Sequence, residues 1–331
     1  MAEEKTLEQA LQENGSLIFL DGVEKKETRW LWYPYIPLGK VTILMGDPGE
    51  GKSTFALNLA AAVTRGMQFP ETHQIVTAPD YVLYQNAEDG LGDTICPRLE
   101  KAGADLRLVM TINEMKENAD MQSTMLYEII SKIRPKLVIL DPLQAYLGDH
   151  VDMHRANEIR PVMRYLAMLA DHFGCAIVLI GHMNKKADLK SLYRSIGSID
   201  LTAAARSVLL VGRDPSEPTR RVIAQVKNSL APEGENVAFT INDGVFHFEG
   251  VCDVPTERLL SQRERRVTPR DRAAECLTRW LTEHGEISVR EIYDMASGED
   301  ITKAALLRAK ASLGIYAHRQ NNQWYWSLPK A

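Results

Sequence analysis

A chain of 331 residues is long enough for about two domains, and its 45% hydrophobic and 25% charged residues are typical of a globular protein with a full core. The sequence has no run of about 18 apolar residues, and its acidic, polar start (MAEEKTLEQA) excludes a signal or transit peptide, so we expect a cytoplasmic protein with no membrane partner. The net charge of −5 does not indicate nucleic-acid binding, and four scattered cysteines without a CxxC pair argue against a zinc site or a disulfide framework.

The predicted elements begin after an N-terminal extension, residues 1–35, which ends in the aromatic stretch RWLWYPY. Strands are expected at 40–45, 80–85, 106–110, 136–141 and 175–181, and helices at 52–66, after Asp89, at 121–133 and at 156–174. Four strands, 206–212, 221–228, 235–241 and 244–250, follow without a helix between them. The pattern predicts an α/β domain over 36–255, with a mainly parallel central sheet covered on both faces and antiparallel additions.

A charged stretch, residues 256–269, is predicted to be a linker to a second, smaller domain over 270–331. The order expected there is helix, strand, two helices and a hairpin around Asn321-Asn322, which is the order of a winged helix. From Thr256 onward the chain has 13 Lys and Arg against 10 Asp and Glu, whereas the preceding residues have 26 against 34. A mildly basic tail on an acidic body is compatible with DNA binding.

The segment GDPGEGKST matches the phosphate-binding loop G-x-x-x-x-G-K-[ST], and it follows an apolar strand and opens a helix, as the motif requires. The backbone N–H groups of such a loop turn toward the phosphates, and the helix N-terminus adds positive potential. The residues expected to bind ATP are Gly46, Asp47, Pro48, Gly49, Glu50, Gly51, Lys52, Ser53 and Thr54. Lys52 would reach the β- and γ-phosphates, and the Ser53 hydroxyl would bind Mg²⁺.

Two carboxylates complete the predicted catalytic set. Asp141 ends the apolar strand KLVILD, where P-loop ATPases hold Mg²⁺. Many such enzymes place a water-activating Glu directly after this Asp, but Pro142 occupies that position here. The alternative is a carboxylate at the end of the strand that follows the P-loop helix, where YVLYQNAED offers Glu88 and Asp89. We favour Glu88 as the general base, because Asp89 is better suited to cap a helix.

With this carboxylate in place, the chain resembles RecA-like ATPases, and among them the RepA-like replicative helicases of plasmids and the related phage and prophage ATPases. The segments that carry the resemblance are PLGKVTILMGDPGEGKST, LYQNAED, LVILDPLQAYLG, IGHMNKK, SIDLTAAARSVLLVGRD and AQVKNSLAP, which follow in order from about Trp30 to Pro232. The tail resembles the winged helix that is often appended to prophage members. Such proteins are ring-shaped, typically hexameric, ATP-driven motors or their relatives.

The resemblance implies roles for further residues. His182 in IGHMNKK matches the family's γ-phosphate sensor, although Gly181 before it departs from the polar or aromatic pair of many relatives. Arg206 matches a candidate arginine finger that acts on the neighbouring subunit's ATP, and Lys227 is the competing cation. The sequence leaves the choice between Arg206 and Lys227 open, and a surface salt bridge is the alternative role for Arg206.

The loop after the IGH strand lines the central channel in RecA-like motors, and here it is basic. The residues expected to contact single-stranded DNA are Lys185, Lys186, Lys190, Tyr193 and Arg194, with the tyrosine stacking on a base. A solvated basic loop is the alternative. In the winged helix, the third helix with Lys303, Arg308 and Lys310 would enter a DNA groove, unless this unit contacts protein instead.

These observations together predict an oligomeric ATPase with ATP and Mg²⁺ as ligands, acting as a helicase or translocase on single-stranded DNA of a mobile element. Two alternatives stay open at this point. One is an ATP-gated DNA-binding regulator or helicase-loading factor without unwinding activity, and the other is a filament-forming recombinase.

Overall fold

The protein, seen in a computed structural model, is described here for residues 20–67, 69, 78–113, 124–147, 151, 155–182, 199–261, 269–299, 301–320 and 322–328. It divides into two compact units, Met1–Leu260 and Ser261–Ala331. Within the described ranges, no helix is both long and apolar enough to cross a membrane.

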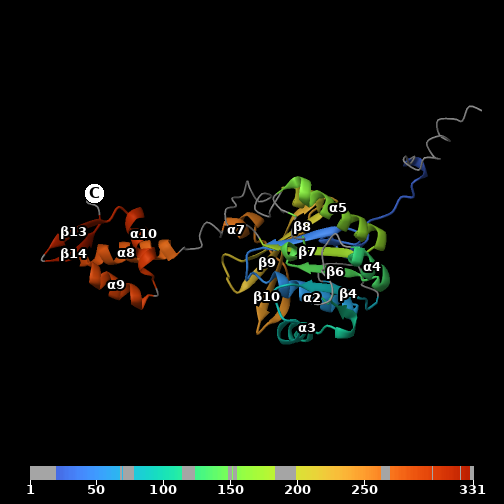
Figure 1. The fold of residues 1–331 in the computed structure, drawn as a ribbon, viewed down its shortest axis with the longest axis horizontal. Helices are drawn as coiled ribbons and strands as arrows, with labels where there is room; N and C mark the ends of the chain where they lie inside the picture. The colour runs from blue at the N-terminus through green and yellow to red at the C-terminus, as the bar shows by residue number, and fades with distance from the viewer. Residues whose placement is uncertain are drawn as a thin grey trace, which may run out of the picture. The chain divides into compact units, whose positions relative to one another are not determined.

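The first unit is built on a nine-stranded sheet with the order β11-β10-β9-β8-β3-β7-β6-β4-β5 (Figure 1). Its strands are β3 (Val41–Gly46), β4 (Val82–Asn86), β5 (Val109–Met110), β6 (Leu137–Asp141), β7 (Ala176–His182), β8 (Ser207–Arg213), β9 (Arg220–Asn228), β10 (Val237–Asn242) and β11 (Val245–Val251). The six strands from β8 to β5 are parallel, and β9, β10 and β11 extend the sheet in antiparallel fashion. The predicted α/β class, with a mainly parallel sheet and antiparallel additions, is confirmed.

Helices cover both faces of this sheet, because the side chains of its central strands alternate between two apolar layers. On β3, Ile43 and Met45 pack with α4 (Thr124–Ile133) and α5 (Ala156–Phe173). Leu44, between them, packs with α2 (Lys52–Arg65) and α3 (Cys96–Lys101) on the opposite face. Figure 1 shows these two helix layers on either side of the strands. Continuous apolar strands therefore reflect burial on both faces.

The remaining helical segments of this unit are short. They are the 3₁₀ turns Leu20–Gly22, Leu106–Leu108 and Leu143–Tyr146, the π-helical turn Leu91–Ile95, α6 (Ile199–Ala204) and α7 (Thr256–Ser261). The helix α7 lies inside the stretch that the sequence assigned to the linker. This helix is packed on the first unit through Leu259, which is buried in the core of that unit beside Gly212 on β8.

An aromatic hairpin also belongs to the core of the first unit. Strands β1 (Trp30–Trp32) and β2 (Ile36–Pro37) pair, and the fully buried Trp32 ring lies 4.1 Å from that of Tyr35. The Tyr35 hydroxyl donates a hydrogen bond of 2.6 Å to the backbone carbonyl of Glu235. Residues 30–35 are thus tied to the sheet, although the sequence assigned them to the N-terminal extension.

The second unit has its own small core. Three helices, α8 (Pro269–His284), α9 (Val289–Gly298) and α10 (Lys303–Ser312), pack against a three-stranded antiparallel sheet of order β12-β14-β13. Its strands are β12 (Glu286–Ser288), β13 (Tyr316–Gln320) and β14 (Gln323–Ser327). Leu277, Trp280, Leu306 and Trp326 are buried at the centre. Thr302 caps α10 by accepting a hydrogen bond from the Ala305 backbone N–H.

Candidate functional site

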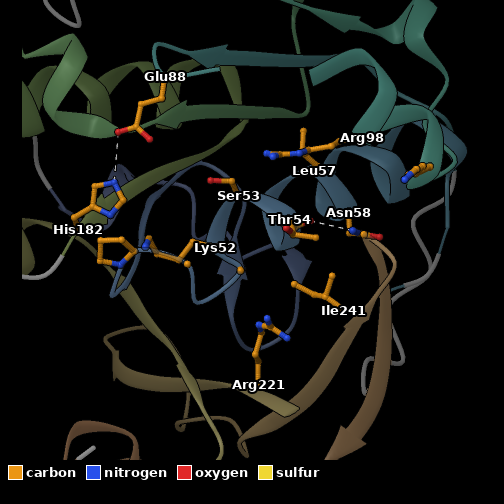
Figure 2. Close-up of a pocket in the computed structure, with 15 residues that line it drawn as sticks. Lys52, Ser53, Thr54, Leu57, Asn58, Glu88, Arg98, His182, Arg221 and Ile241 are labelled. Atoms are coloured by element: carbon orange, nitrogen blue, oxygen red, sulfur yellow. Dashed lines mark hydrogen bonds and ion pairs between the residues drawn. The ribbon is translucent and has the colours of Figure 1, made fainter. Parts of the chain in front are cut away.

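The carboxyl ends of the parallel strands bring the predicted catalytic residues to one edge of the sheet. The P-loop follows β3, Glu88 follows β4 by two residues, Asp141 ends β6 and His182 ends β7. In open α/β sheets this edge is the usual place for a ligand. A pocket of 520 Å³ lies here, and Lys52, Ser53, Glu88 and His182 are among the residues that line it (Figure 2).

Lys52 is buried inside the P-loop that it belongs to. Its Nζ donates hydrogen bonds to the backbone carbonyls of Gly46 (3.0 Å) and Asp47 (2.8 Å). Burial lowers the pKa of Lys52, and the carboxylates of Asp141, Asp47, Glu50 and Glu88 oppose that shift. The ammonium is therefore held among backbone oxygens, and an anionic phosphate could take their place.

Two glycines of the loop cannot be replaced without collision. A Cβ on Gly46 would run into the backbone carbonyl of Val211 on β8. Gly51 has a φ of 92°, and its Cβ would lie 2.9 Å from the Ile241 side chain and 3.2 Å from that of Arg221. The loop thus lies directly against the antiparallel strands that follow β8 in the sheet.

The P-loop is also held by an arginine that the sequence did not single out. Arg213, the last residue of β8, has its Nε 3.2 Å from a carboxylate oxygen of Glu50 and donates from Nη2 to the Gly49 carbonyl at 3.2 Å. The Glu50 side chain is only 8% exposed. Glu50 was expected to bind ATP, but its carboxylate pairs with Arg213. Only the backbone of Glu50 is then left to contact a nucleotide in the loop. Only the parallel register of β3 and β8 brings Arg213 here.

Asp141 and Ser53 form an oxygen site suited to Mg²⁺. The buried Asp141 carboxylate accepts hydrogen bonds from the Ser53 hydroxyl and from the Tyr84 hydroxyl, the latter at 3.0 Å. Burial raises the pKa of Asp141, and these two donors oppose the shift. Among the described residues no group of three or more His, Cys, Asp or Glu could hold a metal. A hydroxyl and one carboxylate fit Mg²⁺, which keeps waters and takes further oxygens from a bound nucleotide.

The geometry separates Glu88 from Asp89. The Asn86 side chain at the end of β4 accepts hydrogen bonds from the backbone N–H of both residues and so fixes the turn. Asp89 faces Arg98 on α3, with 3.0 Å between its carboxylate and Nη1. Glu88 instead lines the pocket, and its carboxylate lies 3.6 Å from His182 Nε2 (Figure 2). Of the two carboxylates, Glu88 is thus the one that lines the pocket, while Asp89 is engaged with Arg98.

The pocket also has an outer wall that no motif predicts. Arg221 and Ile241 come from β9 and β10 on one side of the P-loop helix, and Arg98 comes from α3 on another (Figure 2). Lys101 of α3 also lines the pocket. Lys101 Nζ donates to the Asp243 carbonyl at 3.4 Å, which links α3 to the β10–β11 turn. The Arg221 Nε is buried and has no hydrogen-bond partner in the described part of the chain. These residues line the same pocket as the P-loop, beside the residues that would hold the phosphates.

The two candidate fingers lie at the opposite edge of the sheet. Arg206 precedes Ser207, the first residue of β8, and Lys227 pairs with Val208 near that same strand end. Lys227 Nζ donates to the carbonyls of Thr202, Ala203 and Ala205 at 2.8 to 3.0 Å, so all three of its protons are used at the end of α6. The Arg206 side chain is exposed. The structure therefore brings neither residue to the P-loop of its own subunit.

The predicted DNA-contacting residues Lys185, Lys186, Lys190, Tyr193 and Arg194 lie outside the described residues. The basic side chains of the expected recognition helix are in the described part, and two of the three face aromatic rings of their own unit. Lys303 Nζ lies 4.9 Å from the Tyr293 ring centre, and Lys310 Nζ lies 4.9 Å from that of Trp326. Arg308 is exposed.

Comparison with known proteins gives the family of this chain and several relatives. The model of a family described as AAA domain matches residues 7–188, more than half of the chain. The DNA repair protein RadA of Brucella abortus is 27% identical over 233 residues, which are 69% of this chain and 44% of that protein. The protein of the same name from Mycobacterium tuberculosis H37Rv is 25% identical over 227 residues, 68% of this chain and 42% of that protein. The chain thus spans less than half the length of either relative.

Among solved structures, a KaiC-like protein from the archaeon Pyrococcus horikoshii has 15% sequence identity and a TM-score of 0.47. The similarity covers 64% of this chain and 90% of that one.

Proposed function

Because the chain belongs to the AAA domain family and has a RecA-like P-loop ATPase core, we propose that it is an oligomeric motor that couples ATP hydrolysis to movement along single-stranded DNA. The role would be that of a replicative helicase or translocase of a mobile element, as the resemblance to RepA-like helicases implies. The observation that supports this proposal is that the phosphate loop and an exposed arginine lie at opposite edges of the sheet. The phosphate loop lies at one edge, and the exposed Arg206 lies at the other.

An arginine at the edge opposite the P-loop can act on ATP only when that ATP is bound to a neighbouring subunit. In a head-to-tail ring, one surface of each subunit meets a different surface of its neighbour, so every P-loop can receive a side chain from the next protomer. Arg206 is the better finger, because Lys227 already holds three carbonyls of its own subunit. A finger supplied in this way makes hydrolysis depend on assembly. The ring would be hexameric, by the same resemblance.

The residues of one subunit bind and orient the rest of the reaction. Lys52 would exchange its bonds to the loop carbonyls for the β- and γ-phosphates, and the P-loop backbone would hold their oxygens. Ser53 and Asp141 would hold Mg²⁺, which neutralises charge on the transferring phosphoryl group when bound. Glu88 would orient a water for attack on the γ-phosphate and accept its proton.

His182 would carry the state of the site to the DNA. Its imidazole contacts Glu88, and the basic segment that contains Lys185 to Arg194 follows it directly in the sequence. Loss of the γ-phosphate would change the partners of Glu88 and His182 together. We include the second unit in this assignment as a winged helix, supported by its order of three helices and a three-stranded sheet.

A second candidate function is strand exchange by a filament-forming recombinase. The name of the relatives, DNA repair protein RadA, favours it. The two functions separate in one set of measurements: the ATPase rate with and without single-stranded DNA, strand displacement, and electron microscopy of the assemblies. Rings with DNA-stimulated hydrolysis and unwinding are expected. Filaments that pair strands would support the recombinase, and a DNA-insensitive dimer would contradict both and leave an ATP-gated regulator or loading factor.

The shared site predicts complementation between two inactive variants. Arg206→Ala subunits keep an intact P-loop, and Lys52→Ala subunits keep an intact finger, so a mixed ring contains interfaces with both good halves. Since a finger is worth about 10³–10⁵ in rate, even a minority of repaired interfaces should exceed either parent. The measurement is the ATPase rate of the mixture, after mass photometry has shown that subunits exchange. If the mixture stays inactive while Lys227→Ala complements Lys52→Ala, the finger is Lys227.

The outer wall of the pocket predicts a separate effect on nucleotide affinity. Arg221→Ala should raise the KM for ATP by about three- to thirtyfold with a smaller change in kcat, because it removes a guanidinium available to face the base. Arg65→Ala is the matched control, because it removes an exposed cation at the end of the P-loop helix α2 that is farther from the loop. Equal KM values for the two variants would show that Arg221 does not contact the nucleotide.

A further inference from the structure

The second unit carries an aromatic and cationic pocket that the ATPase reaction does not use. It has a volume of 480 Å³ and is lined by Ser288, Val289, Arg290, Lys310, Ala317, Gln323, Trp324 and Trp326. These residues come from the start of α9, the end of α10 and the β13–β14 hairpin. Two of them are cations, and none is a carboxylate.

The pairing of the hairpin explains why a tryptophan is left uncovered here. Side chains alternate along β14, so Trp324 and Trp326 lie on the same face of the sheet. Trp326 pairs with Ile287 and is buried in the core, whereas Trp324, two residues nearer the turn, extends past the helices and is 53% exposed. A large aromatic ring on the core-facing side of the sheet is thus exposed to solvent, where it does not contribute to the core of the domain. Exposed apolar surface of this kind is typical of a binding site.

The charges around this ring have one sign. Arg290 and Lys310 line the pocket, and Arg319 is the cross-strand partner of Trp324 on the same face. Lys310 is already placed over an aromatic ring, that of Trp326. The carboxylate nearest in the sheet, Glu286, is on β12 and pairs with His318 at 2.9 Å on the other face. The pocket is therefore apolar at its floor and positive at its rim.

We propose that this pocket binds an unpaired base of single-stranded DNA, with the base stacked on Trp324 and the adjoining phosphates facing Arg290 and Lys310. An aromatic platform beside cations is the arrangement that holds single strands without reading their sequence. A paired base could not enter, since its faces are covered by its neighbours in the duplex. The inference rests on the proposed single-stranded DNA substrate, and it gives the strand a contact on the second unit.

The orientation of two lysines of α10 also distinguishes an unpaired strand from a duplex. A recognition helix in a duplex groove presents its cations outward, but Lys303 and Lys310 lie over Tyr293 and Trp326. The exposed apolar and cationic surface is found instead between α10 and the hairpin. Unpaired strands are thus a better match for this unit than the groove of a duplex.

The full-length protein can be tested with a fluorescein-labelled oligothymidylate. Trp324→Ala should raise the Kd by about five- to a hundredfold, since stacking on an aromatic side chain contributes about 1–3 kcal/mol per base. Trp324→Phe, which keeps a ring, should restore most of the affinity. Tyr316→Ala is the matched control, because Tyr316 is 66% exposed on the other face of the same hairpin. Arg290→Ala should weaken binding more than Arg308→Ala, whose cation lies outside the pocket.

Cross-linking identifies the site directly. A single-stranded oligonucleotide that carries 5-iodouracil should, after irradiation and trypsin digestion, modify the peptide 320–330, and a duplex of the same sequence should not. The proposal is overturned if that peptide is unmodified while other peptides cross-link, if duplex modifies it equally, or if Trp324→Ala and Tyr316→Ala bind alike. DNA-stimulated ATP hydrolysis measured on the same variants separates this failure from failure of the motor: a chain that keeps its stimulation but lacks the cross-link contradicts the pocket alone.

Discussion

Lys52→Ala should lower the kcat for ATP hydrolysis by at least about a hundredfold and abolish any DNA-dependent activity. Its ammonium is the cation inside the P-loop, held by the carbonyls of Gly46 and Asp47 within 3.0 Å. Removing one preorganised donor from a site of charge development costs about 10²–10³ in rate. The measurement is steady-state hydrolysis at saturating MgATP, with MgATP affinity determined separately by calorimetry.

The matched control is Lys40→Ala. Lys40 directly precedes β3, and the phosphate loop follows the other end of this strand. The Lys40 Nζ pairs with the Asp171 carboxylate at a distance of 2.5 Å. Both variants should have melting temperatures close to that of the parent protein, so that a loss of activity reflects the site and not the fold. Undiminished turnover in Lys52→Ala would show that the GKST segment is not the nucleotide site.

The residues that the sequence predicted well are those whose position is fixed by a few neighbours along the chain. The P-loop, Glu88, Asp141 and His182 each lie at the end of an apolar strand or within two residues of it, and parallel strands end at a common edge. Their meeting at one pocket follows from strand order, which a repeating strand–helix pattern already restricts. For the same reason the α/β class and its antiparallel additions could be read from the sequence.

The residues that it missed reach the site through register between distant strands. Arg213 and Arg221 belong to a pair of antiparallel strands, and Ile241 comes from the next one. No spacing in the sequence tells which residues of a strand will end beside the P-loop. The choice between Arg206 and Lys227 as the finger also depends on contacts between residues that are distant in the sequence. Only the three carbonyls at the end of α6 explain why Lys227 is engaged within its own subunit.

Glu88→Gln should keep MgATP binding and slow hydrolysis by about 10²–10⁴, which is the usual contribution of a general base. The amide has the size and hydrogen-bonding reach of the carboxylate but cannot accept the proton of the attacking water. Asp89→Asn is the matched control, because Asp89 pairs with Arg98 on α3 and not with a residue of the phosphate end of the pocket. Single-turnover hydrolysis of ATP bound to the assembled protein measures the chemical step without the effect of product release, provided that the variants assemble like the parent protein. If Asp89→Asn stops turnover and Glu88→Gln does not, the base is Asp89.

The contact between Glu88 and His182 requires one more comparison, because removal of the carboxylate also removes the partner of the imidazole. A double-mutant cycle separates the two roles. If Glu88 acted only by holding His182, then His182→Ala alone would cause the full loss, and Glu88→Gln would add nothing to it. If Glu88 acts on the water, its replacement should still slow the chemical step by about 10²–10⁴ in the His182→Ala background.

We expect the second result, because the Glu88 side chain lines the pocket and is 59% exposed. It therefore has room to move from the imidazole to a water beside the γ-phosphate. In that case His182 controls when the Glu88 carboxylate is released to bind the water, and Glu88 accepts the proton.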